Sequence, residues 1–466
     1  MGFPRHTTEI VILKRHESLK RISLLALNVT SLFIHTALYA HAWFDHYYPI
    51  INNQNQGIKL FVNGHILIIL LYITILAIFS RTYGSLKIGY LKPGDVFLSQ
   101  AFSLLAVNII TYAQISLMHN WLVEAGRLTL VFAAQLAVAA VWAWMCDRTY
   151  KHMFPPRDIL LVHGERSVED ILAKFADRED RFRIAGVINI AAGLESVKAE
   201  AAGAYDAIVL WDIPTDVRGI LLKHLYGRSK RVYMMPKITD VLVKGAAQLH
   251  LFDTPVFLTR EYALTVEQRM VKRILDIILS LLLIIITSPL MLIAAAVIRI
   301  YDRGPALFRQ VRCTSGGREF RIIKFRSMRV DAESDGVARL AGRRDGRITP
   351  FGRIIRATRI DELPQLFNIL VGEMSFIGPR PERPEIIARY LEDMPEFAFR
   401  LKMKAGLGGY AQVYGKYNTS PYDKLKLDLT YIESYSLWLD LKLMLLTLRT
   451  LFHPDAAEGV VHEEKF

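Results

Sequence analysis

The chain has 466 residues, enough for two or three domains, and 52% of them are hydrophobic. The mean hydropathy is positive and the formal net charge is +13. These values speak against an entirely soluble protein and favour a membrane protein that meets an anionic partner, namely nucleic acid, anionic lipid or a phosphorylated substrate. Its two cysteines have no metal-binding spacing, which is typical of a reducing compartment.

Four apolar runs occupy the first third of the chain, and each is close to the ~20 residues that cross a bilayer core. They cover residues 22–44, 58–79, 96–118 and 128–146. Lys and Arg gather before the first run, between the second and third, and after the fourth, whereas the other two loops are poor in both. The positive-inside rule therefore predicts four transmembrane helices within residues 1–150, with both ends of this region in the cytoplasm.

Residues 151–262 have the composition of a soluble α/β domain. The strand candidates RDILLVHG, RIAGVINI, AYDAIVLWDIP and RVYMMPKI alternate with polar helical segments, which predicts a small parallel sheet. The first turn keeps only Gly164 of the Gly-x-Gly-x-x-Gly pattern that binds dinucleotides. We therefore expect a degenerate Rossmann-like domain with a role in regulation or assembly, and its ligand is not identified.

A fifth apolar run covers residues 274–300 and belongs to the third region, residues 263–466. Basic residues flank both of its ends, which conflicts with a single crossing. Ser288 and Pro289 lie near its middle, where proline breaks the helix and the serine hydroxyl can satisfy a freed backbone group. We predict a re-entrant helix at about residues 270–300 that returns to the cytoplasmic side; a straight, kinked span is the alternative.

A strongly basic segment follows this helix. Residues 299–360 contain sixteen Lys or Arg and six Asp or Glu, with few aromatic residues between them. Because aromatic stacking is what holds single-stranded nucleic acid, such a ligand is not expected. The basic residues cluster around glycine and proline, and Lys324 and Arg326 lie in KFRSM. Beside a membrane element this charge favours lipid head groups or phosphate, with a solvated basic face as the alternative.

Asp361 and Glu362 are adjacent in IDELPQLFNIL, directly before an apolar helical face. Capping of the helix by Thr358 and Asp361 is the simplest interpretation, since Pro364 suits a first turn. Two acids are more than one cap needs, however, and they lie between the basic segment and Arg380. That setting suits one carboxylate that attacks phosphorus and a second that holds a divalent metal on phosphates.

From about residue 272 to residue 452 the chain resembles the polyprenyl-phosphate hexose-1-phosphate transferases. These are the monotopic phosphoglycosyl transferases of bacterial exopolysaccharide and capsule assembly. The motifs that carry the resemblance are Lys272-Arg273 with Asp276, Ser288-Pro289, GPALFRQ, KFRSM, DELPQLFNIL, GEMSFIGPRPE and AQVYGKYNTSPYDKLKLDLTYI. Four N-terminal spans and a degenerate Rossmann-like domain are similar to its long members. The resemblance implies a membrane α plus α/β architecture with a mainly helical catalytic domain.

The resemblance also implies a reaction. A sugar 1-phosphate moves from a UDP-sugar to undecaprenyl phosphate and UMP is released. Asp361 would attack the β-phosphorus, the lipid phosphate would resolve the phosphosugar-aspartate, and Glu362 would bind Mg²⁺. Five further residues fall on family positions that we expect to bind the substrate phosphates or support them: Lys324, Arg326, Arg356, Arg380 and Asp428.

The acid pair would then work at the membrane surface. Leu363, Leu366, Phe367 and Leu370 are expected to hold its helix in the interface. The segment SYSLWLDLKLMLLTLRTLF is expected either to lie there too or to pack into the core. Two departures from the family are visible: Arg359 stands where many members have a small residue, and VRCTSGGREF differs at the cysteine and threonine.

Glucose and galactose are the favoured sugars, and AQVYGKYNTSPYDK looks closest to glucose-type enzymes. We expect a multi-pass protein of the bacterial inner membrane with a cytoplasmic catalytic region. Its expected partners are the two substrates, downstream glycosyltransferases and a second copy of the chain, and nucleic acid is not among them. Two other function classes stay open. A membrane glycosyltransferase would form a glycosidic bond and release UDP, and a non-enzymatic scaffold or sensor would not depend on Asp361.

Overall fold

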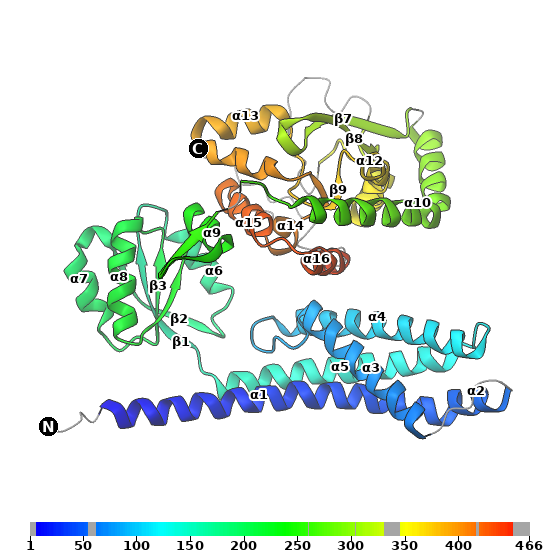
Figure 1. Cartoon of the computed structure of the whole chain (residues 1–466), viewed down its shortest axis with the longest axis horizontal. Coiled ribbons are helices and arrows are strands. Elements are labelled where there is room, and N and C mark those ends of the chain that lie inside the picture. The colour runs from blue at the N-terminus through cyan, green and yellow to red at the C-terminus, as the bar shows by residue number, and fades with distance from the viewer. Residues whose placement is uncertain are drawn as a thin grey trace. The chain divides into compact units, whose positions relative to one another are not determined.

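The computed structural model describes residues 6–54, 62–259, 261–302, 304–329, 345–415 and 419–450 (Figure 1). It divides into two compact units, Met1–Met235 and Pro236–Phe466. The first holds a bundle of long apolar helices and an α/β domain. The second is mainly helical, with three small two-stranded sheets among its described residues. Helical membrane candidates and a small sheet region are therefore both present.

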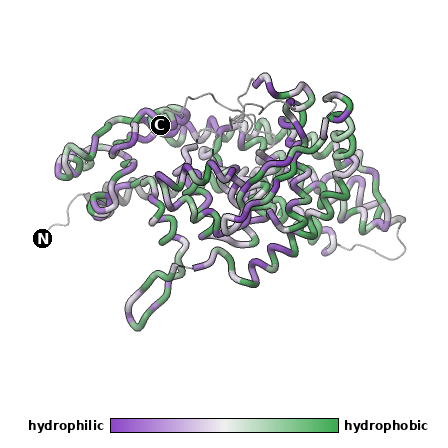
Figure 2. Tube along the Cα trace, turned by 90° about the horizontal axis from the view of Figure 1, so that it is seen from above, coloured by the Kyte–Doolittle hydropathy of each residue, from purple (hydrophilic) through white to green (hydrophobic). Residues whose placement is uncertain are grey.

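The first unit contains helices that are long and apolar enough to cross a membrane. They are α1 (His6–Ala42), which continues through a π-helical turn (Trp43–Tyr47) into α2 (Tyr48–Gln54), α3 (Val62–Tyr83), α4 (Pro93–His119) and α5 (Gly126–Met153). Their shared core includes Tyr39, Trp43 and Leu104. A fifth candidate span, Val266–Tyr301, lies in the second unit. Hydrophobic residues, green in Figure 2, dominate long stretches of the trace.

Polar side chains inside the bundle bond the helices to one another. The Tyr72 hydroxyl of α3 donates to the Asn108 side chain of α4 at 3.2 Å. Asn108 donates to Gln135 of α5 at 2.8 Å, and Gln135 donates to the carbonyl oxygen of His35 in α1 at 3.0 Å. Such bonds fix the register of helices in an apolar medium, where dispersion alone discriminates poorly.

The α/β domain confirms the predicted small parallel sheet. Its elements are β1 (Arg157–His163), α6 (Glu169–Ala176), β2 (Phe182–Asn189), α7 (Leu194–Ala201), β3 (Ala207–Trp211), α8 (Thr215–Gly227) and β4 (Arg231–Met234). The strands pair in parallel in the order β2-β1-β3-β4. Helix α6 covers one face, and α7 and α8 cover the other (Figure 1). A Cβ on Gly164 would lie 2.1 Å from the carbonyl oxygen of Asp212, so the turn after β1 packs against the loop after β3.

A basic corner of this domain contacts the loop between α3 and α4. The Arg178 guanidinium donates to the carbonyl oxygens of Tyr90 and of Gly89, the latter at 2.9 Å. The Arg181 guanidinium lies 4.4 Å from the centroid of the Tyr90 ring. The α/β domain and this loop therefore lie on the same side of any membrane that the helices cross.

The second unit begins with α9 (Ile238–Gly245), the hairpin β5–β6 (Ala247–Leu251, Thr254–Leu258) and α10 (Val266–Asp302). Next come the hairpin β7–β8 (Leu307–Cys313, Glu319–Phe325), α11 (Pro350–Ala357), a 3₁₀ turn (Ile360–Glu362), α12 (Gln365–Val371) and β9 (Ser375–Ile377). The last elements are α13 (Pro384–Asp393), a 3₁₀ helix (Pro395–Lys402), β10 (Gly406–Gly408), α14 (Tyr410–Tyr414), α15 (Pro421–Glu433) and α16 (Leu437–Thr450). Helix α9 packs on α15, so it belongs with this unit.

Helix α10 carries Pro289 in its interior and bends part-way along its length (Figure 1). Because proline has no N–H, the carbonyl oxygen of Ile285, four residues earlier, has no helical donor. The Ser288 hydroxyl donates to this oxygen at 2.9 Å. The serine therefore supplies the hydrogen bond that the proline removes, as its position in the sequence predicts.

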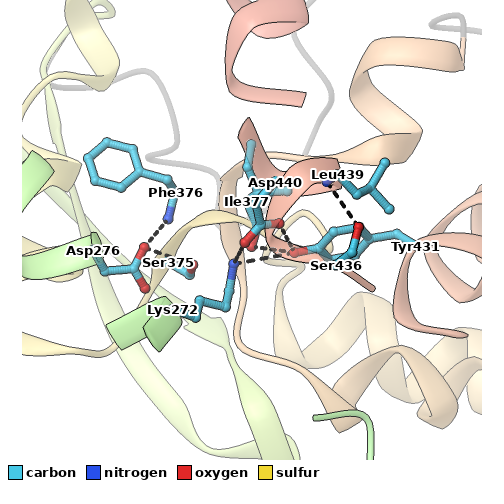
Figure 3. A network of polar contacts seen from close by, with 9 residues as sticks. All are labelled: Lys272, Asp276, Ser375, Phe376, Ile377, Tyr431, Ser436, Leu439 and Asp440. Atoms are coloured by element: carbon cyan, nitrogen blue, oxygen red, sulfur yellow. Dashed lines mark hydrogen bonds and ion pairs between the residues drawn. The ribbon is translucent and has the colours of Figure 1, made fainter. Parts of the chain in front are cut away.

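The first turns of α10 are bonded to distant segments of the second unit (Figure 3). Lys272 and Asp440 form a buried ion pair with an N···O distance of 2.5 Å. The Tyr431 hydroxyl donates to the other carboxylate oxygen of Asp440 at 2.6 Å. Asp276 accepts hydrogen bonds from the Ser375 hydroxyl at 3.0 Å and the Phe376 N–H at 3.1 Å. Helix α10 is thus fixed to β9, α15 and α16.

Candidate active site

The acid pair lies on the 3₁₀ turn between α11 and α12. Helix α12 has Pro364 as its N-cap residue, without a side-chain cap hydrogen bond. The Thr358 hydroxyl instead donates to the carbonyl oxygen of Ile354 at 2.8 Å, at the end of α11. The capping interpretation of Thr358 and Asp361 is therefore wrong, because Thr358 ends α11, Asp361 lies within the 3₁₀ turn, and neither side chain caps α12.

Glu362 is held by two cations. Its Oε1 atom lies 3.5 Å from the Lys324 ammonium nitrogen and 3.5 Å from a guanidinium nitrogen of Arg359. Burial opposes the charge on Glu362, but Lys324, Arg380 and Arg359 outweigh it, so the pKa of Glu362 lies below its ordinary value. Glu362 is therefore an ionised carboxylate at neutral pH.

Asp361 has a different environment. Its Oδ1 atom is buried and has no hydrogen-bond partner among the described residues. Burial, and then the neighbouring charge of Glu362, raise the pKa of Asp361 to about 6, while Lys324, Arg359 and Arg356 act in the opposite direction. Asp361 is then mostly ionised at neutral pH, and one of its carboxylate oxygens accepts no hydrogen bond from the part of the chain that the structure describes. Such an oxygen is available to attack an electrophile.

Asn368 of α12 fixes β8 beside the acid pair. Its Oδ1 atom accepts from the Ile323 N–H at 3.0 Å, and its Nδ2 atom donates to the carbonyl oxygen of Arg321 at 2.9 Å. The Asn368 side-chain amide therefore bonds to the main chain of β8 as a neighbouring strand would. Lys324 is the residue that follows Ile323 in this strand. Sequence reasoning did not single out Asn368, although an amide within the apolar run LFNIL is a signal that could have identified it.

The other end of α12 is bonded to α10. The Arg273 guanidinium donates to the carbonyl oxygens of Ile369 and Leu370 at 2.7 and 2.8 Å. Carbonyls in the last turn of a helix have no helical donors, so a guanidinium there satisfies them and opposes the dipole. Helix α10 and the helix that follows the acid pair are thereby joined directly.

Arg380 lies in the GPRPE loop, and its charge lowers the pKa of Glu362. The Arg400 guanidinium donates to the carbonyl oxygen of Arg380 at 2.9 Å and pairs with the buried Asp428 at 2.8 Å. Asp428 therefore supports Arg380 through Arg400. Arg400, in the segment FRLK, was not identified from the sequence.

Arg356 and Arg326, the two other arginines predicted to bind phosphate, have different surroundings. The charge of Arg356, on α11, lowers the pKa of Asp361. The Arg326 side chain is buried, and its backbone N–H donates to the carbonyl oxygen of Ala306 at 2.9 Å. A Cβ on Gly304 would lie 2.3 Å from the Arg326 guanidinium, so the glycine permits a close approach. The GPALFRQ and KFRSM motifs therefore pack against each other.

The carboxylates of Asp361 and Glu362 suit an Mg²⁺ ion that is also bound by substrate phosphates. Among the described residues, no group of three or more His, Cys, Asp or Glu side chains could hold a metal ion. Mg²⁺ commonly binds one or two carboxylates together with substrate phosphates and water. The ionised Glu362 and the unpartnered oxygen of Asp361 fit this mode, but would not form a complete protein cage.

The apolar side of α12 is divided between core and surface. Leu366 is only 2% exposed and belongs to the main core of the second unit, so its predicted membrane contact is wrong. Phe367 and Val371 are 42% and 74% exposed. Helix α16 is divided in the same way, with Leu443 buried and Trp438 exposed. Core packing is therefore confirmed for one face of α16, and the membrane-interface position of the exposed face stays a prediction.

Known proteins with similar sequences share this region. The family model described as bacterial sugar transferase matches residues 267–454. The undecaprenyl-phosphate glucose phosphotransferase of Komagataeibacter xylinus is 30% identical over 410 residues, which cover 80% of this chain and 73% of that protein. The UDP-glucose:undecaprenyl-phosphate glucose-1-phosphate transferase of Caulobacter vibrioides is 43% identical over 191 residues, which cover 40% of this chain and 71% of that protein.

A relative with a different sugar in its name is about as similar. The UDP-N-acetylgalactosamine-undecaprenyl-phosphate N-acetylgalactosaminephosphotransferase of Aeromonas hydrophila is 42% identical over 184 residues. The match covers 39% of this chain and 43% of that protein, so it spans less than half of either. The names of these relatives differ in the sugar.

Proposed function

This chain belongs to the bacterial sugar transferases, a family of polyprenyl-phosphate hexose-1-phosphate transferases, and from this premise we propose the reaction of its acid pair. The enzyme transfers a hexose 1-phosphate from a UDP-sugar to undecaprenyl phosphate and releases UMP. UDP-glucose is the favoured donor, with UDP-galactose second. The reaction is the first membrane step of exopolysaccharide or capsule assembly. One observation carries the proposal: the unpartnered oxygen of Asp361 lies beside a carboxylate held by two cations.

In the first step, an Asp361 carboxylate oxygen attacks the β-phosphorus of the donor. A bond forms between this oxygen and phosphorus, and the bond from phosphorus to the bridging oxygen breaks. UMP leaves with that oxygen, and the hexose phosphate is joined to Asp361 as an acyl phosphate. Lys324, Arg356 and Arg380 balance the negative charge that gathers on the phosphate oxygens. The acid pair is partly buried, with the Glu362 side chain 15% exposed, and partial burial strengthens these interactions.

In the second step, a phosphate oxygen of undecaprenyl phosphate attacks the same phosphorus. The bond to Asp361 breaks, the carboxylate is regenerated and the product is undecaprenyl diphosphate hexose. The lipid phosphate stays at the depth of the head groups, so the aspartate must also lie at the membrane surface. The exposed side chains of Phe367 and Val371 on α12 support this position.

Glu362 is the residue that would hold Mg²⁺ on the substrate phosphates. When bound, the ion supplies positive charge to the phosphate oxygens and to the departing UMP. One feature of this chain supports the assignment: Glu362 is an ionised carboxylate at neutral pH, which is a ligand that Mg²⁺ prefers.

The proposal includes the membrane arrangement. Helices α1, α3, α4 and α5 cross the bacterial inner membrane, and α10 enters and leaves through the cytoplasmic leaflet with its bend at Ser288 and Pro289. The basic flanks of α10 and its exposed apolar side chains support this arrangement, for example Leu282, Ile286 and Leu292. The catalytic residues are then in the cytoplasm, where UDP-sugars are found.

The remaining partners follow from this arrangement. The α/β domain is a regulatory or assembly domain, and its contact from Arg178 to the α3–α4 loop supports coupling to the membrane helices. The enzyme works as a homodimer, and downstream glycosyltransferases take its lipid-linked product.

A product assay tests the reaction. The purified chain is incubated with undecaprenyl phosphate, Mg²⁺ and each of a panel of UDP-sugars, and UMP and UDP are quantified separately. UMP release with one sugar supports the proposal and identifies the donor. UDP release would indicate a glycosidic transferase and would contradict the roles of Asp361 and Glu362. Full function of Asp361→Asn would favour a scaffold or sensor.

A further inference from the structure

Arg359 has an unusual backbone conformation directly before the acid pair. Its φ and ψ are 57° and 17°, in the left-handed region. Residues with a Cβ adopt this region seldom, because the side chain crowds the following carbonyl, and glycine fills it without strain. Strain of this kind persists where the surrounding structure gains from it, and it concentrates at functional sites.

The backbone of Arg359 does not require an arginine. Its N–H donates to the carbonyl oxygen of Arg356 at 3.3 Å, and its own carbonyl oxygen accepts from the Glu362 N–H at 3.2 Å. A glycine would keep both main-chain hydrogen bonds and would remove the strain. The reason for a large charged residue at this position must therefore lie in its side chain.

The side chain reaches the same oxygen of Glu362 that Lys324 already neutralises. Four cations act on the acid pair: Lys324, Arg356, Arg359 and Arg380. With both carboxylates ionised, these six groups carry a net positive charge. The Arg359 side chain is 32% exposed, so it is accessible to a ligand without displacement of the core.

We propose that Arg359 binds a substrate phosphate. When the substrate enters, the Arg359 guanidinium exchanges its contact with Glu362 for hydrogen bonds to the phosphate oxygens. This inference rests on the proposed function and adds a binding residue to it. Guanidinium donates two parallel hydrogen bonds to phosphate, which lysine cannot do. The phosphate belongs either to the donor diphosphate or to the lipid acceptor, since both must approach Asp361.

The test uses three variants of the full-length chain in detergent. Arg359→Gly removes the side chain and suits the left-handed conformation, so we expect it to unfold at a temperature no lower than the wild type. Arg359→Lys keeps the positive charge but cannot donate two parallel hydrogen bonds to one phosphate. Arg389→Ala removes an exposed arginine of α13 and is the matched control. The KM for UDP-glucose and the KM for undecaprenyl phosphate are each measured at saturation of the other substrate.

The expected result is a rise of at least about tenfold in one KM for Arg359→Gly, a smaller rise for Arg359→Lys and no change for Arg389→Ala. A rise in the KM for UDP-glucose assigns Arg359 to the donor, and a rise in the KM for undecaprenyl phosphate assigns it to the acceptor. Both KM values within twofold of the wild type would overturn the proposal, whatever happens to kcat.

A binding measurement separates this inference from the proposed function. If the wild type released UMP from no donor, the reaction proposal would fail, and calorimetric titration with UDP would still test Arg359. Weakening of UDP binding by at least about tenfold in Arg359→Gly would support the phosphate contact. Equal binding of UDP and, in a parallel titration, of undecaprenyl phosphate by Arg359→Gly and the wild type would overturn it, because the proposed contact is to a phosphate of one of these two ligands.

Discussion

The hydroxyl of Ser288 donates a 2.9 Å hydrogen bond to the carbonyl oxygen of Ile285, the oxygen that Pro289 leaves without its helical donor. An α10 without this bend would be about 55 Å long, at 1.5 Å for each of its 37 residues. That is far more than the ~30 Å of a bilayer core. The bend therefore decides whether the helix can return to the side from which it entered.

Pro289→Ala should allow α10 to straighten and to cross the membrane, because the alanine restores the hydrogen bond to Ile285. A cysteine in place of Tyr301 shows on which side of the membrane the C-terminal end of α10 lies. In intact cells, an impermeant maleimide should label Tyr301→Cys only when Pro289→Ala is also present. Cysteine in place of the exposed Trp121, in the α4–α5 loop, is the positive control. Labelling of Tyr301→Cys with Pro289 in place would contradict the re-entrant arrangement.

Lys272→Met should destabilise the second unit by about 3–5 kcal/mol, because it leaves the carboxylate of Asp440 buried without its cation. The double variant Lys272→Met/Asp440→Asn removes both charges and keeps an acceptor for the Tyr431 hydroxyl, so it should recover most of the loss. Denaturant titration in detergent measures the free energies of unfolding. Equal losses in the single and double variants would show that the ion pair is not the source of the effect.

Lys324→Met should lower the rate of UMP release by at least about a hundredfold, because it removes a cation from Glu362 and from the transferred phosphate. The pKa of Glu362 should rise, since the Lys324 charge is the largest influence that lowers it. Lys324→Arg keeps the charge and should retain more activity. Unfolding temperatures of both variants control for stability, and a rate near that of the wild type for Lys324→Met would contradict this role.

Formation of the Asp361 adduct should fall as the pH drops below about 6, because the pKa of Asp361 is raised to about 6 and only the ionised carboxylate attacks. Above this pH the carboxylate is ionised and the rate should level off. The first step is measured alone, as UMP released without lipid acceptor, since the lipid phosphate titrates in the same range. A rate that stays constant down to pH 5 would contradict the raised pKa.

Local signals in the sequence predict much of this chain. Length and apolarity identify the long helices, and Ser288 next to Pro289 predicts both the break and the hydrogen bond that compensates for it. Alternating strand and helix patterns predict the parallel sheet of the α/β domain. The adjacent charges of Asp361 and Glu362 indicate the site, because two acids beside an apolar face exceed the needs of a helix cap.

Contacts between distant segments could not be predicted in the same way. Asn368 is bonded to β8 more than 40 residues away in sequence, as the bonds to Arg321 and Ile323 show. Arg400 supports Arg380 and pairs with Asp428, and nothing in its local sequence distinguishes it from a surface arginine. Leu366 faces the core rather than the membrane because β8 and α10 cover that side of α12. These outcomes depend on tertiary packing.

The most direct test of the covalent mechanism is the intact mass of the purified chain after incubation with UDP-glucose and Mg²⁺ in the absence of undecaprenyl phosphate. The account predicts a mass increase of one hexose phosphate less one water, equimolar UMP, loss of the adduct when undecaprenyl phosphate is added, and no adduct on Asp361→Asn. An adduct that persists on Asp361→Asn, or turnover to UMP by that variant at the wild-type rate, would contradict it.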